Sequence, residues 1–379
     1  MQRRKFLKLA ALSGLAVGST VGMPAHAREP GDQGPLLVLV HATGGWDPRL
    51  VCDPILDPAQ NRVYTEIATA GDIAYAPLAM TRRTTGLGAA SAKTLMGSTE
   101  FFDKYANRLH CINGIDIGTV HHDEATSSLL TGQPTEGALS IAEHLALDNG
   151  LPHLASHRGV TSGVAPSATL PSVDPHQPFE RSCDPDAFLG GGGHDALAVP
   201  SNPAPPTGLG GELQDLQRFM RQADVALAAF DANLAVAVHL ELGGFDTHGS
   251  HDREQVTQLG KLFRGVDFLM TEAERRGLTQ RLTVMIGSEF GRGPYFDGPQ
   301  PFAGKEHWPV GSAMLMGRGV IGNRVSGATD AQQRAYPLSG RTWTPADVHR
   351  ELGVACGVEL PSHGSNAGRS FGVPSRSAS

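Results

Sequence analysis

Two short clusters of acidic and histidine residues, each placed at the end of an apolar run, constrain the fold of this chain more than any other feature. The apolar runs, residues 234–242 and 282–287, read as buried strands. Residues 243–248 follow the first run and residues 288–292 follow the second, while residues 256–270 between them have the apolar spacing of a core-facing helix. This order predicts a β-α-β unit with both clusters at one edge of a sheet.

A third cluster, residues 306–308, adds a glutamate and a histidine further along the chain. Open α/β sheets bind ligands outside the carboxyl ends of their strands, so we expect the chemistry of the protein at these three clusters. A carboxylate and two imidazoles gathered there, from Asp246, His248 and His307, suit a hard or borderline divalent cation such as zinc or manganese.

The N-terminus carries a twin-arginine pattern, Arg3-Arg4-Lys5-Phe6-Leu7-Lys8, followed by a mildly apolar run and the small-residue site at residues 25–27. This order predicts an export signal over residues 1–27, cleaved after Ala27. A membrane-anchoring helix is the alternative, but the run is short and rich in glycine for a membrane span. We therefore expect the twin-arginine translocase to export the folded protein to the periplasm or the exterior.

Composition excludes some classes of function. The formal net charge is -7, and removal of residues 1–27, which hold four basic and no acidic residues, makes it -11. Such a chain is a poor partner for nucleic acid, and no later run is long enough for stable membrane insertion. Four widely spaced cysteines without a CxxC pair argue against a structural zinc site, and three disulfide pairings stay open. A single soluble domain over residues 28–379 is expected.

Residues 36–40 predict another buried strand, which leads into His41 and then into Gly44, Gly45 and Asp47. The two glycines allow a tight turn with close backbone approach, which puts Asp47 at the carboxyl edge of the strand. A turn aspartate that caps the next segment is the alternative interpretation.

Residues 119–124 follow a predicted core strand, residues 109–115, and precede a helix start. They include His122, and the positive potential of a helix N-terminus favours a bound anion there. A charged, solvated helix entry is the alternative. At the start of the helix between the first two clusters, His251 is expected to be exposed.

Residues 150–210 have little periodicity, a run of four glycines and a proline-rich stretch. We interpret them as an irregular lid inserted in the single domain. Strands alternate with helices elsewhere, which predicts an α/β fold with a doubly wound, mainly parallel sheet covered by helices on both faces.

The ordered set of motifs, from Gly44-Gly45-Trp46-Asp47 to Glu306-His307-Trp308 and with the twin-arginine leader, resembles the exported bacterial family DUF1501 over about residues 35–357. That family is placed in the alkaline-phosphatase-like and sulfatase-like superfamily. The resemblance implies a metal-dependent hydrolase ancestry and an alkaline-phosphatase-like fold.

The resemblance also implies roles for individual positions. Asp246, His248 and His307 resemble the ligands of one divalent metal, and Asp47 and Glu289 resemble the carboxylates of a second, although Phe290 stands where an imidazole is usual. The sequence Leu129-Leu130-Thr131-Gly132 resembles the end of the sulfatase signature, but the chain has no Cys-x-Pro-Ser-Arg.

Counting back from that signature puts His122 at the position of the usual nucleophile. His122 is then a nucleophile, a replacement ligand or a general acid, with the last two favoured. Arg292 is expected to clamp an anionic oxygen of the substrate, or else to pair with Glu289 or Asp297.

Three functions remain open on the sequence alone. The first is an exported metal-dependent hydrolase of phosphate or sulfate esters, with a metal-activated water or a side chain as nucleophile and a small anionic ester or glycan as substrate. Zinc is the expected metal, with manganese or calcium as alternatives and the number open. The second is a degenerate relative that binds a metal or an anionic glycan without turnover. The third is a metal-independent serine esterase that uses Ser288, although the chain has no Gly-x-Ser-x-Gly elbow.

Overall fold

A computed structural model describes residues 10–11, 13–18, 34–134, 138–156, 211–338 and 340–360. Its main element is an eight-stranded sheet. In spatial order the strands are β1 (Leu15–Gly18), β6 (His153–Ser156), β7 (Ala237–Leu242), β2 (Leu36–Ala42), β8 (Leu282–Gly287), β11 (Val310–Gly317), β5 (Leu109–Asp116) and β12 (Arg324–Ser326).

The sheet is mixed but mainly parallel. Strands β6, β7, β2 and β8 pair in parallel, and so do β5 and β12. Strand β11 lies antiparallel between β8 and β5, and β1 is antiparallel to β6, so all strands except β1 and β11 run in one direction. The predicted β-α-β unit is confirmed as β7, α8 and β8, with β2 inserted between the two strands.

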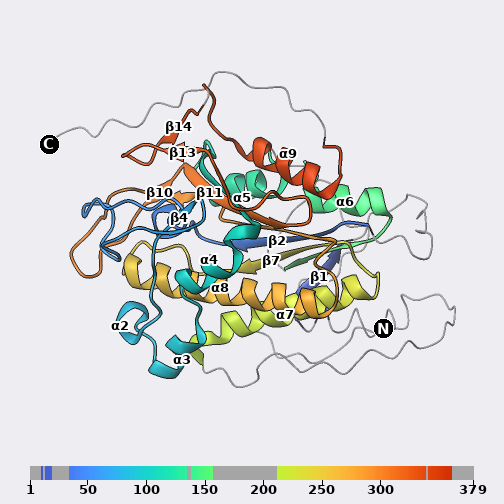
Figure 1. The fold of residues 1–379 in the computed structure, drawn as a ribbon, viewed down its shortest axis with the longest axis horizontal. Helices are drawn as coiled ribbons and strands as arrows, with labels where there is room; N and C mark the ends of the chain where they lie inside the picture. Colours follow the sequence, from blue (N-terminus) through green and yellow to red (C-terminus); the bar gives the residue numbers. More distant parts are fainter. Residues whose placement is uncertain are drawn as a thin grey trace.

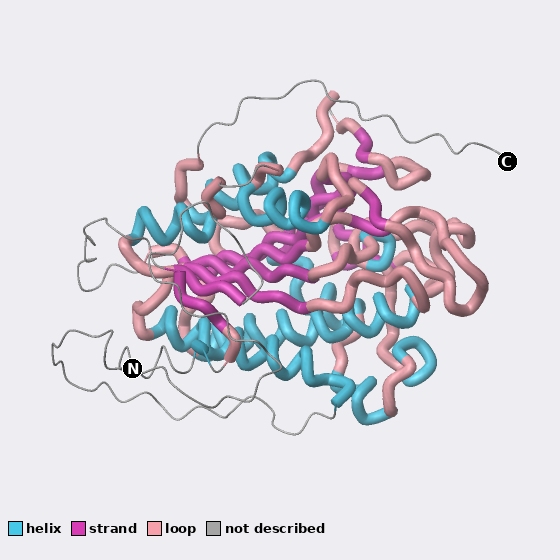
Figure 2. Tube along the Cα trace, turned by 180° about the vertical axis from the view of Figure 1, so that it is seen from behind, coloured by secondary structure: helices cyan, strands magenta, loops and turns pink. Residues whose placement is uncertain are grey.

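Helices cover both faces of the sheet (Figures 1 and 2). One face packs against α4 (Ser98–Tyr105), α7 (Gln214–Asp231) and α8 (His251–Arg275) through the larger hydrophobic core. The other face packs against α5 (His122–Thr131), α6 (Ile141–Asn149) and α9 (Pro345–Cys356) through a second core. The predicted α/β, doubly wound arrangement is therefore confirmed.

The remaining elements are short and lie around the sheet. Three two-stranded sheets pair β3 (Ala68–Ala70) with β4 (Ile73–Tyr75), β9 (Gly291–Arg292) with β10 (His307–Trp308), and β13 (Ala328–Thr329) with β14 (Ala335–Tyr336). The other helical segments are α2 (Arg82–Thr85), α3 (Ala89–Thr94), η1 (Pro48–Leu50), η2 (Ala106–Arg108) and η4 (Gly211–Leu213).

Burial explains why the central strands form where they do. All seven residues of β2 are buried, as expected for a strand with helices on both faces. Helix α8 buries the predicted apolar stripe, which includes Val256, Phe263 and Met270, and it begins with Asp252 and Glu254 in its first turn, where acidic side chains complement the helix dipole.

Two predictions fall largely outside the described residues. The irregular lid of residues 150–210 is described only up to residue 156, where β6 ends, so the lid stays a prediction. Of the predicted leader, residues 10–11 and 13–18 are described, and they include the edge strand β1. Among the described residues no helix combines the length and the apolar character that a membrane crossing needs.

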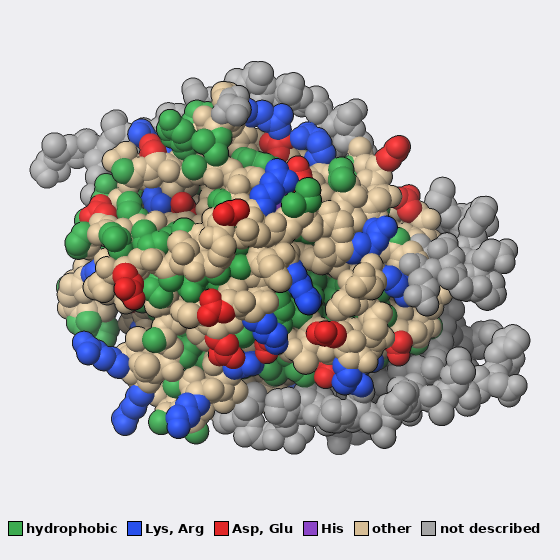
Figure 3. All heavy atoms as spheres, viewed as in Figure 1, with side chains coloured by type: hydrophobic (Ala, Val, Ile, Leu, Met, Phe, Trp, Pro, Cys, Tyr) green, Lys and Arg blue, Asp and Glu red, His purple; other side chains and the backbone are tan. Residues whose placement is uncertain are grey.

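Acidic and basic side chains are interspersed on the face shown in Figure 3.

Candidate metal centre

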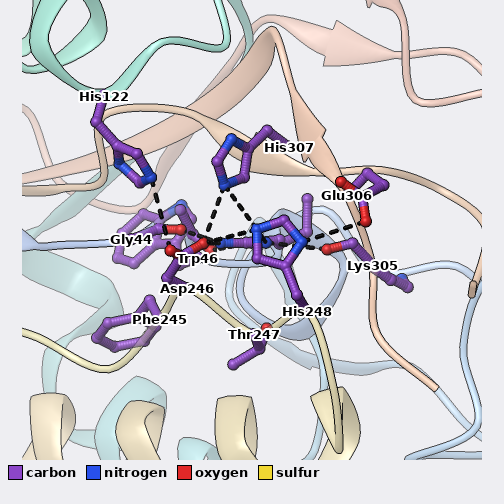
Figure 4. Close-up of polar contacts among 12 residues, drawn as sticks. Gly44, Trp46, His122, Phe245, Asp246, Thr247, His248, Lys305, Glu306 and His307 are labelled. Atoms are coloured by element: carbon purple, nitrogen blue, oxygen red, sulfur yellow. Dashed lines mark hydrogen bonds and ion pairs between the residues drawn. The ribbon is translucent and has the colours of Figure 1, made fainter.

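Three segments bring the candidate ligands together at the carboxyl edge of the sheet (Figure 4). The loop after β7 supplies Asp246 and His248, β10 supplies His307, and the first residue of α5 supplies His122. The ring of Phe290 packs against those of His122 and His307, with centroids 4.9 and 4.4 Å away. The structure thus brings together Asp246, His248 and His307, the residues expected to hold the first metal, and His122 lies beside them.

Close backbone contact holds the Asp246 loop in place. Gly44 has φ +118°, and a Cβ atom on it would lie 2.2 Å from the backbone nitrogen of Asp246. A Cβ on Gly45 would lie 2.6 Å from the ring of Phe290. The glycine pair therefore lets the turn after β2 touch the turn after β7, and such a close backbone approach is what two glycines permit.

Asp246 lies at the centre of the group. Its Oδ1 atom is 2.9 Å from His307 Nε2 and 3.0 Å from His248 Nε2, and these two nitrogens are 3.0 Å from each other. Its Oδ2 atom is 3.7 Å from His122 Nε2. One ligand atom each from His122, Asp246 and His307 all lie within 4.8 Å of one another, which is close enough for one ion to contact all three.

Each of the three imidazoles has an acceptor on its far nitrogen. The Nδ1 atom of His307 faces the Val120 carbonyl at 3.1 Å, that of His248 faces Glu306 Oε1 at 3.2 Å, and that of His122 faces Glu289 Oε1 at 2.9 Å. Because these oxygens accept, each Nδ1–H donates, and Nε2 is the ring nitrogen left to face Asp246. Three Nε2 atoms are therefore directed at one carboxylate, an arrangement that suits a bound cation.

Arg292 holds Asp246 in position. Its Nη2 atom donates to Asp246 Oδ1 at 2.5 Å and to the Gly44 carbonyl, Nε donates to the Gly45 carbonyl at 3.0 Å, and Nη1 donates to the Lys305 carbonyl at 2.9 Å. The guanidinium is fully buried and its donors are occupied. The geometry favours a structural ion pair over a clamp on substrate, and the partner is Asp246 instead of Glu289 or Asp297.

The charges of the group depend on these contacts. Burial raises the pKa of Asp246, but hydrogen bonds from Arg292 and His307 more than offset it and lower the pKa from 3.8 to about 2. The hydrogen bond to Glu289 raises the pKa of His122. Asp246 is therefore ionised at neutral pH and able to act as a ligand.

The structure does not bring Glu289 into the group as a ligand. Oε1 accepts from the Gly44 N–H at 2.7 Å and from His122, and Oε2 contacts His41 Nε2 and Ser288 Oγ, both at 3.0 Å. Burial raises its pKa, but His41 and His122 hold the pKa of this carboxyl well below its usual range. The position fits an ionised carboxylate that orients histidines, a role that metal-ligating imidazoles commonly require.

Asp47, the other carboxylate of the expected second metal position, lies in a different cluster. Its Oδ2 atom is 2.7 Å from Lys305 Nζ and 2.9 Å from His251 Nε2, and Oδ1 caps η1 by accepting from the Arg49 N–H. Burial raises the pKa of Asp47, but Lys305 and His251 hold it well below its usual value. Asp47 therefore acts as the turn cap of the alternative interpretation. Its Oδ2 atom, which was expected to bind a metal, forms a buried ion pair with Lys305.

Sequence reasoning missed three members of these clusters. His251 is 1 % exposed, so the expectation of an exposed first-turn histidine was wrong. The available signal for a buried His251 was its position four residues after Thr247, whose hydroxyl lies 2.8 Å from Nδ1 of His251. Lys305 is equally buried, and no periodicity marks it. Glu306 belongs to a quoted motif, but its contact with His248 depends on tertiary structure.

These features define an α/β protein with a histidine and carboxylate centre at the carboxyl edge of its sheet. Residues 207–377 match the model of the family described as "Protein of unknown function (DUF1501)", which confirms the family resemblance seen in the motifs. The matched range includes Asp246, Glu289 and His307. No curated protein matches the chain significantly.

Several solved structures match the chain at low similarity. The lipoteichoic acid synthase LtaP from Listeria monocytogenes has 9% identity and a TM-score of 0.42, with 93% of this chain and 78% of that chain covered. A putative sulfatase from Bacteroides thetaiotaomicron has 10% identity and a TM-score of 0.41, covering 87% and 72%. A mutant of TAB5 alkaline phosphatase has 10% identity and a TM-score of 0.38, covering 86% and 99%. Similarity at this level transfers no activity or ligand to the present chain.

Proposed function

We propose that this chain is an exported, metal-dependent hydrolase of phosphate or sulfate esters. The observation that carries the proposal is the convergence of three Nε2 atoms, from His122, His248 and His307, on the carboxylate of Asp246. The twin-arginine motif and small-residue cleavage site support export to the periplasm or the exterior.

The residues present fit a divalent metal of the zinc class. Neutral imidazoles and a carboxylate are zinc ligands, and three protein ligands with a position left for substrate are typical of catalytic zinc sites. When bound, such a cation acts as a Lewis acid that polarises an ester oxygen and activates water. His122, Asp246 and His307 would hold it, with His248 beside them.

The protein groups supply orientation and access. Arg292 fixes Asp246, and Glu289 fixes the ring of His122 with Nε2 toward the group. The side chains of His122 and Asp246 are 43% and 49% exposed, so a substrate can reach them from solvent. Because Arg292 already neutralises Asp246, a divalent cation leaves the site with positive charge, which favours an anionic ester.

The geometry disfavours a serine esterase. Ser288 is 3% exposed, and its hydroxyl donates to the Ala42 carbonyl at 2.5 Å while it accepts from the N–H groups of Gly45 and Trp46. A buried hydroxyl with this set of partners is a structural clamp on the turn after β2. The alternative of a degenerate relative can be told apart from a hydrolase by experiment, because it predicts bound metal without ester hydrolysis.

The experiment begins with elemental analysis of the natively folded protein, purified without chelator or immobilised metal. A screen of aryl phosphate and aryl sulfate esters then compares wild type with D246N and H122Q, before and after chelation. We expect chelator-sensitive hydrolysis in wild type, loss of at least 100-fold in kcat/KM in D246N, and loss of metal from the same variant.

H121Q is the matched control for H122Q. His121 is the neighbouring exposed histidine, and its side chain makes no cap hydrogen bond to α5. H121Q should keep wild-type activity. Bound metal without hydrolysis of any ester would favour the non-catalytic, metal-binding alternative. Unchanged metal content in D246N would contradict the assignment of Asp246 as a ligand.

A further inference from the structure

A second group of ligand-type side chains lies on the face of the sheet that packs against α5 and α6. His41 on β2 stands opposite Glu241 on β7, and His239 lies two residues earlier on β7. Side chains two residues apart on a strand share a face, and paired residues of neighbouring strands do too. One ligand atom from each of the three residues lies within 4.8 Å of the others.

The histidines of this group have nitrogen atoms without partners. His41 and His239 are 2% and 3% exposed. Within the described part of the chain, Nδ1 of His41 and both ring nitrogens of His239 have no hydrogen bond, and Glu241 Oε1 lies 4.0 Å from His239 Nε2. Buried polar atoms nearly always have a partner, so these atoms indicate a missing ligand.

A cation and a buried water are the two candidates for that partner. An ordered internal water needs two to four polar neighbours, and the three side chains would supply them. The donor set favours the cation, because two imidazoles and a carboxylate are the ligands that zinc-class metals prefer.

Glu289 orients His41 for such a ligand. Its Oε2 atom accepts from His41 Nε2 at 3.0 Å, which leaves the lone pair of the neutral ring on Nδ1. Neither ring nitrogen of His239 has a hydrogen-bond partner among the described residues, so either nitrogen can face the ligand. Two neutral imidazoles and a carboxylate are the donor set of a zinc-class cation.

We propose that His41, His239 and Glu241 form a second metal site, for a divalent transition metal of the zinc class. Glu289 lies between the two sites, because its Oε2 atom contacts His41 and its Oε1 atom contacts His122. The second site joins neighbouring strands β2 and β7 and is independent of the ester hydrolysis proposed for the first.

The test is a zinc titration of the chelator-stripped full chain, followed by calorimetry. We expect two equivalents in wild type, one in H239Q and one in D246N. H110Q is the matched control, because His110 is equally buried on β5 but its Nε2 atom is 2.8 Å from Ser326 Oγ. H110Q should bind two equivalents. Undiminished stoichiometry in H239Q would overturn the second site.

The two proposals fail separately. Loss of one equivalent in H239Q with none lost in D246N supports the second site and removes the first. If H239Q does not fold, E241Q replaces it, since the Glu241 side chain is 14% exposed. Cobalt(II) added to D246N should then give the visible absorption of a tetrahedral site, and the D246N/E241Q double variant should lose it; a spectrum unchanged by E241Q would contradict the proposal.

Discussion

Glu289 contacts more protein groups than the metal-ligand role suggested by its motif would require. Both of its oxygens are used by protein groups, and two of those groups are histidines of different clusters. Its place in the Ser-Glu-Phe-Gly-Arg motif marks the right region of the chain. Whether such a carboxylate binds metal or orients a ligand depends on partners such as Gly44, which lie far away in sequence.

Replacement of Glu289 by glutamine tests the orienting role. The amide keeps one acceptor oxygen, so either His41 or His122 must face an NH2 group and change tautomer. We expect zinc affinity to fall about 10–100-fold, the usual effect of losing such a partner. Competition with a chromophoric chelator measures it, and an unchanged Kd would show that Glu289 does not set the ring orientation.

The Asp47–Lys305 pair predicts a stability effect. Both side chains are 1% exposed, so K305M leaves Asp47 as a buried, uncompensated charge and should cost about 3–5 kcal/mol. Urea unfolding measures the loss. The double variant D47N/K305M removes both charges and should be more stable than K305M; equal stabilities would mean that the two groups do not interact.

The same pair predicts how stability depends on pH. The pKa of Asp47 is depressed in the folded protein, so its contribution is present above the unfolded-state pKa of about 4 and is lost as the pH falls toward the folded-state pKa. The free energy of unfolding of wild type should therefore decline between about pH 5 and pH 3. D47N/K305M should decline less over that interval, and parallel curves would contradict the assignment.

At the scale of elements, the turn after β2 and the loop after β7 are built to touch. G44A places a methyl group against the Asp246 backbone, where the φ of +118° is also unfavourable for alanine. We expect a loss of more than about 3 kcal/mol in unfolding free energy, together with weaker metal binding, because the Asp246 loop must move.

Gly118 provides the control for this variant. It also has a positive φ, +77°, but a Cβ atom there would meet nothing within 4 Å. G118A should cost only the conformational strain, about 1 kcal/mol, and should leave metal affinity unchanged. Equal losses in G44A and G118A would show that contact with the Asp246 backbone is not important.

The central elements could be predicted because their signals are local. Strands such as β2 and β8 are continuous apolar runs, and α8 has a clear stripe ending at Met270, so both their type and their parallel arrangement follow from the sequence. The ion pair of Asp47 with Lys305 could not be predicted, since it joins residues 258 positions apart without any periodic pattern.

On the scale of the whole molecule, metal binding should be linked to global stability. A cation that binds only the folded chain adds about 4 kcal/mol at a free concentration of 1,000 times Kd. Chelation should therefore lower Tm in a thermal scan, and restored zinc should raise it again. The change in Tm should be smaller in D246N than in wild type. A wild-type Tm that is unaffected by both chelator and zinc would contradict a metal bound at either centre.

The direction of β11 has a consequence for how such sites can be found. This strand begins at the edge of the sheet where its antiparallel neighbours β8 and β5 end, and His307 comes just before it in the chain. A search for ligands among the residues that follow each strand finds Asp246 and Glu289 but misses His307. Where one strand is reversed, the residues to inspect are those that precede it.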